Sequence, residues 1–350
     1  MEQSSTSTQP DPSKIMQVGM GFWASKTLLA AVNFKLFTKL AGTSKKATEI
    51  KAELQLQTTD RHVYDWLDAL VSLGFLQREG LYEIAVYSDS PDTEMFLDEN
   101  KPSFIGGILK MGSSRLYKFW GNLEEGLLTG KPQNESKDGG NMNFFEDLYK
   151  SPEKLKEFVN AMSGIQAGNF MTLAKKFDFD KYKTMADVGG ADGYLCCLVA
   201  LQHPGMSFTT YDLPPVAPLA KVAIAKFKLT DRIKVASGDF LKDSVPSAEI
   251  ITMGNILHGL NEETKLEVIK KVYDALPENG LLIAIENIID ENRNKNTFGM
   301  LMSLNMLIEN GDGFDYTMND FEKWTKAAGF KKTELIPLAG PTSAAVAYKS

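Results

Sequence analysis

Apolar residues in the first hundred positions recur with the period of a helix. They lie three or four residues apart in IMQVGMGFWASKTLLAAVNFKLFTKL, and the spacing continues in SKKATEIKAEL and TTDRHVYDWLDALVSLGF. The next segment, LQREGLYEIA, alternates apolar and polar residues around a glycine turn, which predicts a small hairpin. Three helices followed by such a hairpin make a winged-helix arrangement, so we expect a mainly helical domain of this type over residues 14–105.

The pattern changes in the second part of the chain. Residues 106–180 again have helical spacing, with a loop at GKPQNESKDGGNMN that is rich in Gly and Asn and is expected on the surface. Over residues 181–350, helical stretches alternate with short apolar runs, which are TMADVGG, SFTTYDL, IKVASGD, EIITMGNIL and GLLIAIENI. This alternation predicts a Rossmann-like α/β core with a mostly parallel, doubly wound sheet, so that residues 106–350 form a second domain.

Composition agrees with a two-domain globular protein. The chain has 350 residues, of which 43% are hydrophobic and 24% are charged. Residues 1–13 are polar and lack the apolar core of a signal peptide, so we expect a disordered leader, and no run approaches the roughly 18 apolar residues of a membrane span. Cys196 and Cys197 are adjacent in an apolar run and can supply no disulfide framework. We expect a protein of the reducing cytoplasm.

Charge bears on one competing hypothesis, a winged-helix regulator that binds DNA and senses a nucleotide. The net charge is −7, and residues 1–105 contain 10 Lys and Arg against 14 Asp and Glu, which gives −4. The helix that would enter the DNA groove offers Asp60, Asp65 and Asp68 against Arg61 and His62. Because such a helix must approach a polyanion, we expect no nucleic-acid partner and, for the same reason, no anionic membrane surface.

The first predicted helical segment carries more apolar side chains than a small domain easily buries. They are Phe22, Trp23, Leu28, Leu29 and Phe34. A surface of this kind is typical of a subunit interface, so we expect a homodimer.

Three successive strand ends carry residues suited to a nucleotide. The first ends in DVGGADG, where Gly189 and its neighbours allow the backbone to approach a ligand closely before a helix begins. Ala191 stands where a dinucleotide fingerprint would place a glycine, which disfavours NAD. The second ends at Asp212, whose carboxylate can accept two ribose hydroxyls, and the third at Asp239 and Phe240, which suit the amino group and the face of an adenine.

With DVGGADG, YDLP, SGDF, ILHGL, AIEN and GDGFDYT in this order, the chain resembles the class I S-adenosylmethionine-dependent methyltransferases. Within them it is similar to the small-molecule O-methyltransferases that include the caffeate and acetylserotonin enzymes, and the resemblance covers nearly the whole chain. It implies S-adenosyl-L-methionine as the cofactor and S-adenosyl-L-homocysteine as a product. The residues that it assigns to cofactor binding are Gly189, Asp212, Asp239, Phe240, Asn255 and Tyr149.

The resemblance also implies a catalytic group. It assigns His258 as the general base that takes the proton of an acceptor hydroxyl, and Glu286 and Asp315 as the acids that orient it. The chemistry agrees, since a phenol with a pKa of about 10 is mostly protonated at neutral pH and attacks a methyl sulfonium better as a phenolate. The sequence departs from the family pattern at Gly259, where many relatives have Asp, and at Asp315, where Glu is usual.

Two further expectations concern the acceptor. Nitrogen or carbon methylation on the same scaffold stays an alternative to hydroxyl methylation. Residues suited to a flat aromatic acceptor are Met111, Tyr117, Phe119, Trp120, Met302, Asn305 and Met306.

The three histidines have no ligand spacing with the cysteines, and the sequence shows no carboxylate cluster, so we expect a metal-free reaction.

Overall fold

The computed structural model describes residues 10–137 and 148–350, which form two compact units, Met1–Ser113 and Ser114–Ser350. Residues 1–9 of the leader predicted at 1–13 lie outside the described residues. The loop predicted at 130–143 lies outside them from residue 138 onward. The surface prediction is wrong for Gln133 and Asn134, which are buried. Both donate hydrogen bonds to backbone carbonyls in the last turn of helix α15 (Thr297–Asn310).

The first unit confirms the winged-helix prediction, with one correction to its first helix. The long helical stretch is three helices, because the chain breaks at Met20 and again at Lys35, which has a left-handed φ of 58°. The helices of this unit are α1 (Ser13–Gly19), α2 (Gly21–Asn33), α3 (Leu36–Leu40), α4 (Ala47–Glu53), α5 (Asp60–Ser72), α6 (Pro91–Phe96) and α7 (Gly106–Met111).

The predicted hairpin of this unit is present but longer than expected. Strand β2 (Leu76–Glu79) pairs antiparallel with β3 (Val86–Asp89), and β1 (Lys45–Lys46) joins the other edge of β3. Leu28 packs against the core that contains Leu67 and Leu70, and Leu29 is buried, whereas Phe22 and Trp23 are exposed. Leu28 therefore supports the core of its own unit, and the exposed apolar face is carried by Phe22 and Trp23.

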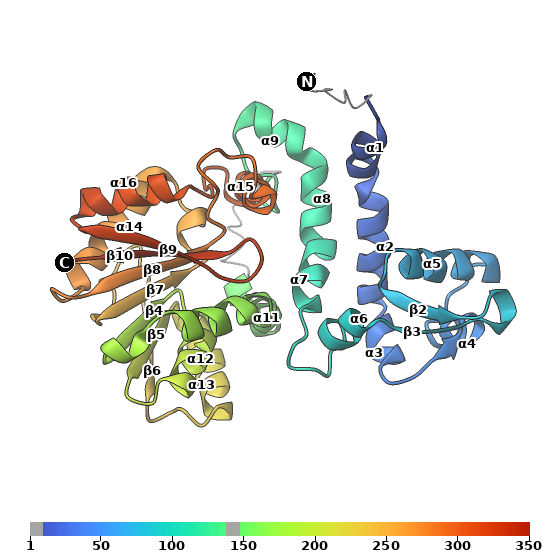
Figure 1. Cartoon of the computed structure of the whole chain (residues 1–350), viewed down its shortest axis with the longest axis horizontal. Helices are drawn as coiled ribbons and strands as arrows, with labels where there is room; N and C mark the ends of the chain where they lie inside the picture. Colours follow the sequence, from blue (N-terminus) through green and yellow to red (C-terminus); the bar gives the residue numbers. More distant parts are fainter. Residues whose placement is uncertain (1–9, 138–147) are drawn as a thin grey trace, which may run out of the picture. The chain divides into compact units, whose positions relative to one another are not determined.

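The second unit is built on a seven-stranded sheet with the order β6-β5-β4-β7-β8-β10-β9 (Figure 1). Its strands are β4 (Thr184–Val188), β5 (Ser207–Asp212), β6 (Ile233–Ser237), β7 (Ile250–Gly254), β8 (Leu281–Glu286), β9 (Lys332–Pro337) and β10 (Ser343–Tyr348). Strands β4 to β8 pair in parallel, which confirms the mostly parallel α/β prediction. The last two strands were not predicted, and β10 pairs antiparallel with both β8 and β9.

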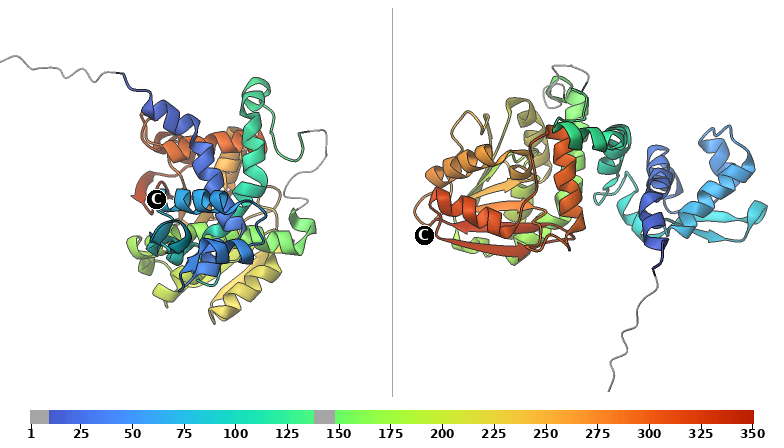
Figure 2. Two further views of the ribbon diagram at one scale, coloured as in Figure 1. Left: turned by 90° about the vertical axis from the view of Figure 1, so that its right-hand side faces the viewer. Right: turned by 90° about the horizontal axis from the view of Figure 1, so that it is seen from above.

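Helices cover both faces of this sheet, and Figure 2 gives two further views of the layers. The side chains of β8 alternate between two cores: Ile283 and Ile285 pack into one, and Leu282 and Ala284 into the other. The first core contains residues of α11 (Pro152–Lys176), α12 (Tyr194–Gln202) and α13 (Ala217–Lys226). The second contains residues of α14 (Glu262–Ala275) and α16 (Met318–Ala328). Short helices α8 (Tyr117–Phe119) and α9 (Leu123–Thr129) begin the unit.

Among the described residues, no single helix has both the length and the apolar character to cross a membrane. The pair α1 and α2, bent by 41°, meets that criterion together by length and composition.

Candidate functional site

The predicted cofactor residues lie along the carboxyl edge of the parallel strands. Strand β4 pairs with β5 on one side and with β7 on the other, so the strand order reverses at the centre of the sheet. In sheets of this kind the crevice at that reversal holds the ligand. Gly189 follows β4 and Asn255 follows β7, and the two residues therefore flank the crevice.

The loop after β4 needs glycine at its first position. Gly189 has φ +72°, and a Cβ atom there would overlap the side chain of Ile256, which follows β7. Ala191 and Asn255 also have left-handed φ values, of 48° and 52°. Asparagine tolerates this region better than most residues, whereas alanine is strained in it. Both strand ends thus carry residues in the left-handed conformation.

Asp212 joins the first two strand ends. Its Oδ2 accepts the backbone N–H of Ala191 at 2.9 Å, and its Oδ1 accepts that of Leu213 at 2.7 Å. Burial raises the pKa of this carboxyl, and the two N–H donors oppose the shift. Each carboxylate oxygen keeps a second lone pair, so Asp212 can still accept hydroxyl groups.

Asp239 and Phe240 follow β6, and each is fixed by a lysine. Lys242 lies 2.9 Å from the carboxylate of Asp239 and lowers its pKa, and Lys271 donates to the carbonyl of Phe240 at 2.7 Å. Tyr149 packs in a cluster with Ala191, and the pKa of its phenol is raised by burial and by the charges of Asp212 and Asp239. The predicted tyrosine therefore lies within electrostatic range of both predicted acids.

A third acid, Asp187, is buried at the end of β4, next to the glycine loop. Thr252 of β7 donates its hydroxyl to Asp187 Oδ1 at 2.7 Å, and burial raises the Asp187 pKa to about 7. A Cβ atom at Gly190 would come within 2.9 Å of Asp187 Oδ2. The sequence pattern placed Asp187 at the strand end without assigning it this supporting position.

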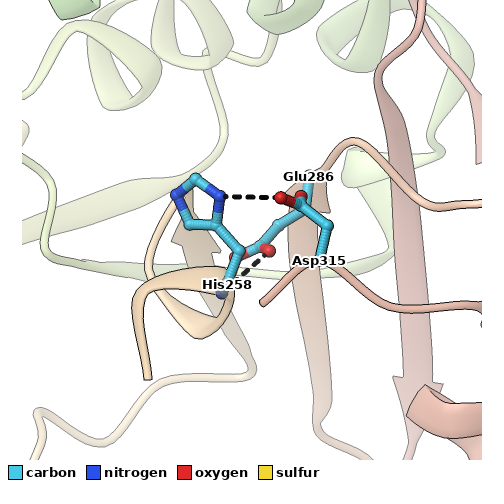
Figure 3. A group of neighbouring side chains, drawn as sticks. All are labelled: His258, Glu286 and Asp315. Atoms are coloured by element: carbon cyan, nitrogen blue, oxygen red, sulfur yellow. Dashed lines mark hydrogen bonds and ion pairs between the residues drawn. The ribbon is translucent and has the colours of Figure 1, made fainter. Parts of the chain in front are cut away.

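His258 lies in the 3-10 turn Leu257–Gly259 that follows β7, and it faces two buried acids (Figure 3). Its Nδ1 is 3.5 Å from Oδ2 of Asp315, an ion-pair distance longer than a hydrogen bond of about 2.7–3.2 Å. Distances of this length between catalytic groups commonly shorten when substrate binds. Nε2 is the ring nitrogen that points away from both acids in Figure 3.

Glu286 contacts the histidine through the backbone. Its carboxylate, at the end of β8, accepts the N–H of Ile256 at 3.0 Å and the N–H of His258 at 3.0 Å. The two acids predicted to orient the imidazole therefore occupy different places: Asp315 faces the ring, and Glu286 holds the turn that carries it.

The two acids act on the histidine in the same electrostatic direction. Burial lowers the pKa of His258, but Glu286 and Asp315 raise it by more, so the net shift is upward from the ordinary value of 6.5. Burial raises the pKa of Glu286 to about 7, with His258 opposing and Asp315 adding to the shift. The imidazolium form is thus stabilised inside a largely buried cluster.

The segment that carries Asp315 approaches the histidine turn closely. A Cβ atom at Gly313 would lie 2.8 Å from the carbonyl oxygen of His258, so only glycine fits there without displacement. Asn310 donates to the carbonyl of Gly259 at 3.1 Å, and Asp315 donates its backbone N–H to Ser303 at 3.2 Å. Helix α15 therefore contacts both the turn that carries the base and the segment that carries its acid.

The predicted acceptor residues of the second unit meet in part. Trp120 donates its indole N–H to Oδ1 of Asn305 at 2.9 Å, and the Asn305 amide lies 4.0 Å from the sulfur of Met302. Met306 is buried on the same helix, α15. The guanidinium of Arg115 lies over the ring of Phe119 and pairs with Glu135 and Glu309. Arg115 was not among the predicted acceptor residues. Met111 belongs to the first unit.

The predicted base and its two acids also have the spacing of a metal site, which was not expected from the sequence. His258, Glu286 and Asp315 offer ligand atoms within 4.8 Å of one another, a spacing that suits a metal ion. Both oxygens of Glu286 already accept backbone N–H groups, however, and Asp315 faces the imidazole. We therefore interpret the group as a proton-transfer site.

Comparisons with known proteins agree with this geometry. A model of the O-methyltransferase domain matches residues 120–331, and a model of the O-methyltransferase dimerisation domain matches residues 16–99. The tetracenomycin polyketide synthesis 8-O-methyl transferase TcmO of Streptomyces glaucescens is 33% identical over 97% of each chain. The N,N-dimethyltransferase OxyT of Streptomyces rimosus is 27% identical over 91% of this chain and 90% of that relative.

A solved structure of PigF, a methyl transferase from a Serratia species, bound to S-adenosylhomocysteine has a TM-score of 0.84 and 26% identity. The match covers 97% of this chain and 100% of that chain. The chain therefore belongs to the O-methyltransferase family. It is an S-adenosylmethionine-dependent O-methyltransferase with a dimerisation domain, which confirms the resemblance seen in the sequence.

The contact of Thr252 with Asp187 predicts a pH-dependent loss of stability. Asp187 is protonated below about pH 7 and charged above it, because burial raises its pKa to about 7. Thr252→Val removes the hydroxyl that the charged form accepts, so we expect a loss of about 1–3 kcal/mol in unfolding free energy at pH 8 and a smaller loss at pH 5.5. Urea unfolding at both pH values measures the difference.

Thr325→Val is the matched control. The hydroxyl of this buried threonine donates to the backbone carbonyl of Phe321 at 2.8 Å, an acceptor that does not titrate. Its loss should be equal at the two pH values. An equal loss for Thr252→Val as well would contradict the role given to Asp187.

Proposed function

We propose that this enzyme transfers the methyl group of S-adenosylmethionine to a hydroxyl of a small aromatic acceptor, with His258 as the general base and without a metal ion. The observation that carries the proposal is the pairing of His258 Nδ1 with the buried carboxylate of Asp315. This pairing favours the tautomer with hydrogen on Nδ1 and leaves the lone pair on Nε2.

The proposed mechanism follows from these groups. When bound, S-adenosylmethionine supplies an electrophilic methyl group attached to a sulfonium. His258 accepts the proton of the acceptor hydroxyl at Nε2 as the oxygen attacks, since a phenol with a pKa of about 10 is mostly protonated at neutral pH. Asp315 and Glu286 stabilise the resulting imidazolium, because their charges are the influences that raise the His258 pKa.

The acceptor class is inferred from the residues around α15. The indole of Trp120 and the thioether of Met302 both contact the amide of Asn305, and the three groups can bind a flat ring with one polar group. A relative that methylates an oxygen on a polyketide and one named for nitrogen methylation share the family. Hydroxyl methylation is favoured because a nitrogen acceptor that is already neutral needs no base, whereas this site provides one.

The assignment of His258 as the general base predicts a specific defect in the His258→Ala variant. We expect the variant to bind S-adenosylmethionine as the wild type does and to lose about 10²–10⁴-fold in kcat at pH 7.5 with a phenolic acceptor. Its activity should rise as the pH approaches 10, because the acceptor then ionises without help. The measurement is S-adenosylhomocysteine release and methylated product by mass spectrometry, with EDTA present throughout and phenols, hydroxyindoles and aromatic amines as acceptors.

His62→Ala is the control, because His62 is exposed on α5 in the other unit. Wild-type-like kcat in His258→Ala would disprove the base. Loss of wild-type activity in EDTA would disprove metal independence, and a methyl group found on nitrogen would replace the acceptor class.

We propose that Gly189, Asp212, Asp239, Phe240, Asn255 and Tyr149 hold the cofactor. Two observations support this assignment: glycine at position 189 lets the loop after β4 pack directly against Ile256 of the neighbouring strand end, and Asp212 keeps acceptor capacity at the adjacent strand end. Tyr149 lies within electrostatic range of both Asp212 and Asp239. These observations support the assignment of the methionine part to the glycine loop and of the ribose to Asp212.

Gly189→Ala tests this assignment. A left-handed alanine is strained by about 1–3 kcal/mol, and its Cβ would overlap Ile256 across the crevice. We expect S-adenosylhomocysteine to bind at least about tenfold more weakly by isothermal titration calorimetry. Gly205→Ala, where a Cβ meets nothing within 4 Å, should bind as the wild type does. Equal affinity in the two variants would count against the assignment.

We also propose that the enzyme is a homodimer that uses the apolar face of α1 and α2. The dimerisation-domain match covers both helices from residue 16, and Ile15, Val18, Phe22 and Trp23 are all exposed on them. Arg61 and Arg78 are paired with Asp65 and Asp68, so these basic groups of the unit are already neutralised. A protein partner therefore suits this unit better than DNA does.

Trp23→Glu should disrupt the dimer. The side chain is 64% exposed in the single chain, and a charge in an apolar interface is costly. We expect light scattering after size exclusion to give the mass of one chain for this variant and of two for the wild type. Val222→Glu, an exposed apolar position on α13 of the other unit, should stay dimeric. A dimeric Trp23→Glu would place the interface elsewhere.

A further inference from the structure

Lys265, in the first turns of α14, is a fully buried cation beside the proton-transfer group. Its Nζ donates to the carbonyl of Leu260 at 2.7 Å and to the carbonyl of Phe314 at 3.0 Å. It also lies over the ring of Phe314, 3.2 Å from the centroid. Burying a lysine is costly, whereas an apolar residue at this position would continue the buried stripe of α14 formed by Val268, Ile269 and Val272. Packing alone therefore does not explain a lysine here.

The two carbonyls belong to the two segments that carry the base and its acid. Leu260 is two residues after His258, and Phe314 immediately precedes Asp315. One ammonium group therefore ties the turn after β7 to the segment between α15 and α16. The 3.5 Å approach of His258 to Asp315 depends on the relative position of these segments.

The charges around the histidine balance only when the lysine is counted. Glu286 and Asp315 face both His258 and Lys265, and Glu262 and Asp312 act on Lys265 from the solvent side of the cluster. Tyr316, the remaining titratable neighbour of Glu286, stays neutral because burial raises its pKa far above the ordinary value. Two buried carboxylates and one lysine leave one negative charge, and a protonated imidazole cancels it.

We propose that Lys265 is a positioning residue of this site, which clamps the segments of His258 and Asp315 together and offsets part of the negative charge that the two carboxylates place around the imidazole. The inference rests on the proposed function of His258 as the base. Without the lysine, two carboxylates would face the imidazole uncompensated, and the histidine would keep its proton up to a higher pH. A base that is already protonated cannot accept the acceptor's proton.

The test is the pKa of His258 itself, measured by NMR titration of protein labelled with ¹⁵N-histidine. The chain has three histidines, so His258→Ala assigns the signal. Lys265→Gln keeps N–H donors for the two carbonyls and removes the charge, and Lys265→Met removes both. We expect both variants to raise the His258 pKa by about 1 unit or more and Lys265→Arg to leave it near the wild-type value.

Measurements of activity and of cofactor binding separate the effect of the charge from the effect of the clamp. With a phenolic acceptor, Lys265→Gln should shift the acid limb of kcat/KM to higher pH, and Lys265→Met should also lower kcat by up to about 100-fold at the pH optimum. Affinity for S-adenosylhomocysteine should change little in either variant. Lys270→Met is the control, since Lys270 lies on the same helix with its side chain 53% exposed and pairs with Asp274.

An unchanged His258 pKa in folded Lys265→Gln would overturn the proposal, and so would loss of activity without a shift in pKa. If Lys265→Met does not fold, the Gln and Arg variants still decide the charge effect. Full activity in His258→Ala would instead refute the proposed base, and the NMR titration would distinguish that failure, because it requires no turnover.

Discussion

The buried carboxylate of Glu286 is the group around which the site is arranged. It ends β8 and accepts the N–H groups of Ile256 and His258 from the turn after β7. An uncompensated carboxylate at this depth would be costly, and the same is true of the two N–H groups without an acceptor. Each therefore requires the other, and the direction of the His258 side chain is set by the sheet that fixes Glu286.

The same principle applies along the whole carboxyl edge of the sheet. Asp187 accepts a hydroxyl from Thr252, and Asp212 accepts two backbone N–H groups, so each buried acid is compensated by neutral donors. Neutral donors satisfy the oxygens but leave the negative charge in place. The edge is therefore complementary in sign to a sulfonium, although the strands that form it are almost wholly apolar.

Much of this arrangement could be predicted from sequence because it is local. The runs that become β4, β5 and β8 are apolar and end at glycines or acids, which marks both the strands and their carboxyl ends. The pairing of His258 with Asp315 joins residues 57 positions apart, and only the motif order of a family suggested it. The sequence does not indicate that Glu286 binds the main chain of the turn and not the imidazole ring, because this depends on the three-dimensional positions of the two strand ends.

Other features were missed for identifiable reasons. Lys265 stands at the buried position of the helical stripe, three and four residues before Val268 and Ile269, but a lysine on a helix normally indicates a solvent-exposed position. Strand β10, with the sequence SAAVAY, consists largely of alanine, which is depleted in strands. The break at Lys35 has no glycine to announce it, since a lysine takes the left-handed conformation there.

The hairpin of β9 and β10 also determines how the sheet ends. Strand β8 is buried along its whole length, so without β10 it would present a continuous apolar edge with unpaired backbone groups, the kind of template on which chains aggregate. Strand β9 takes the outer place instead, and Lys332, Glu334 and Pro337 on it discourage further pairing. The hairpin thus protects this catalytic domain from self-association through its sheet, independently of any part it has in the reaction.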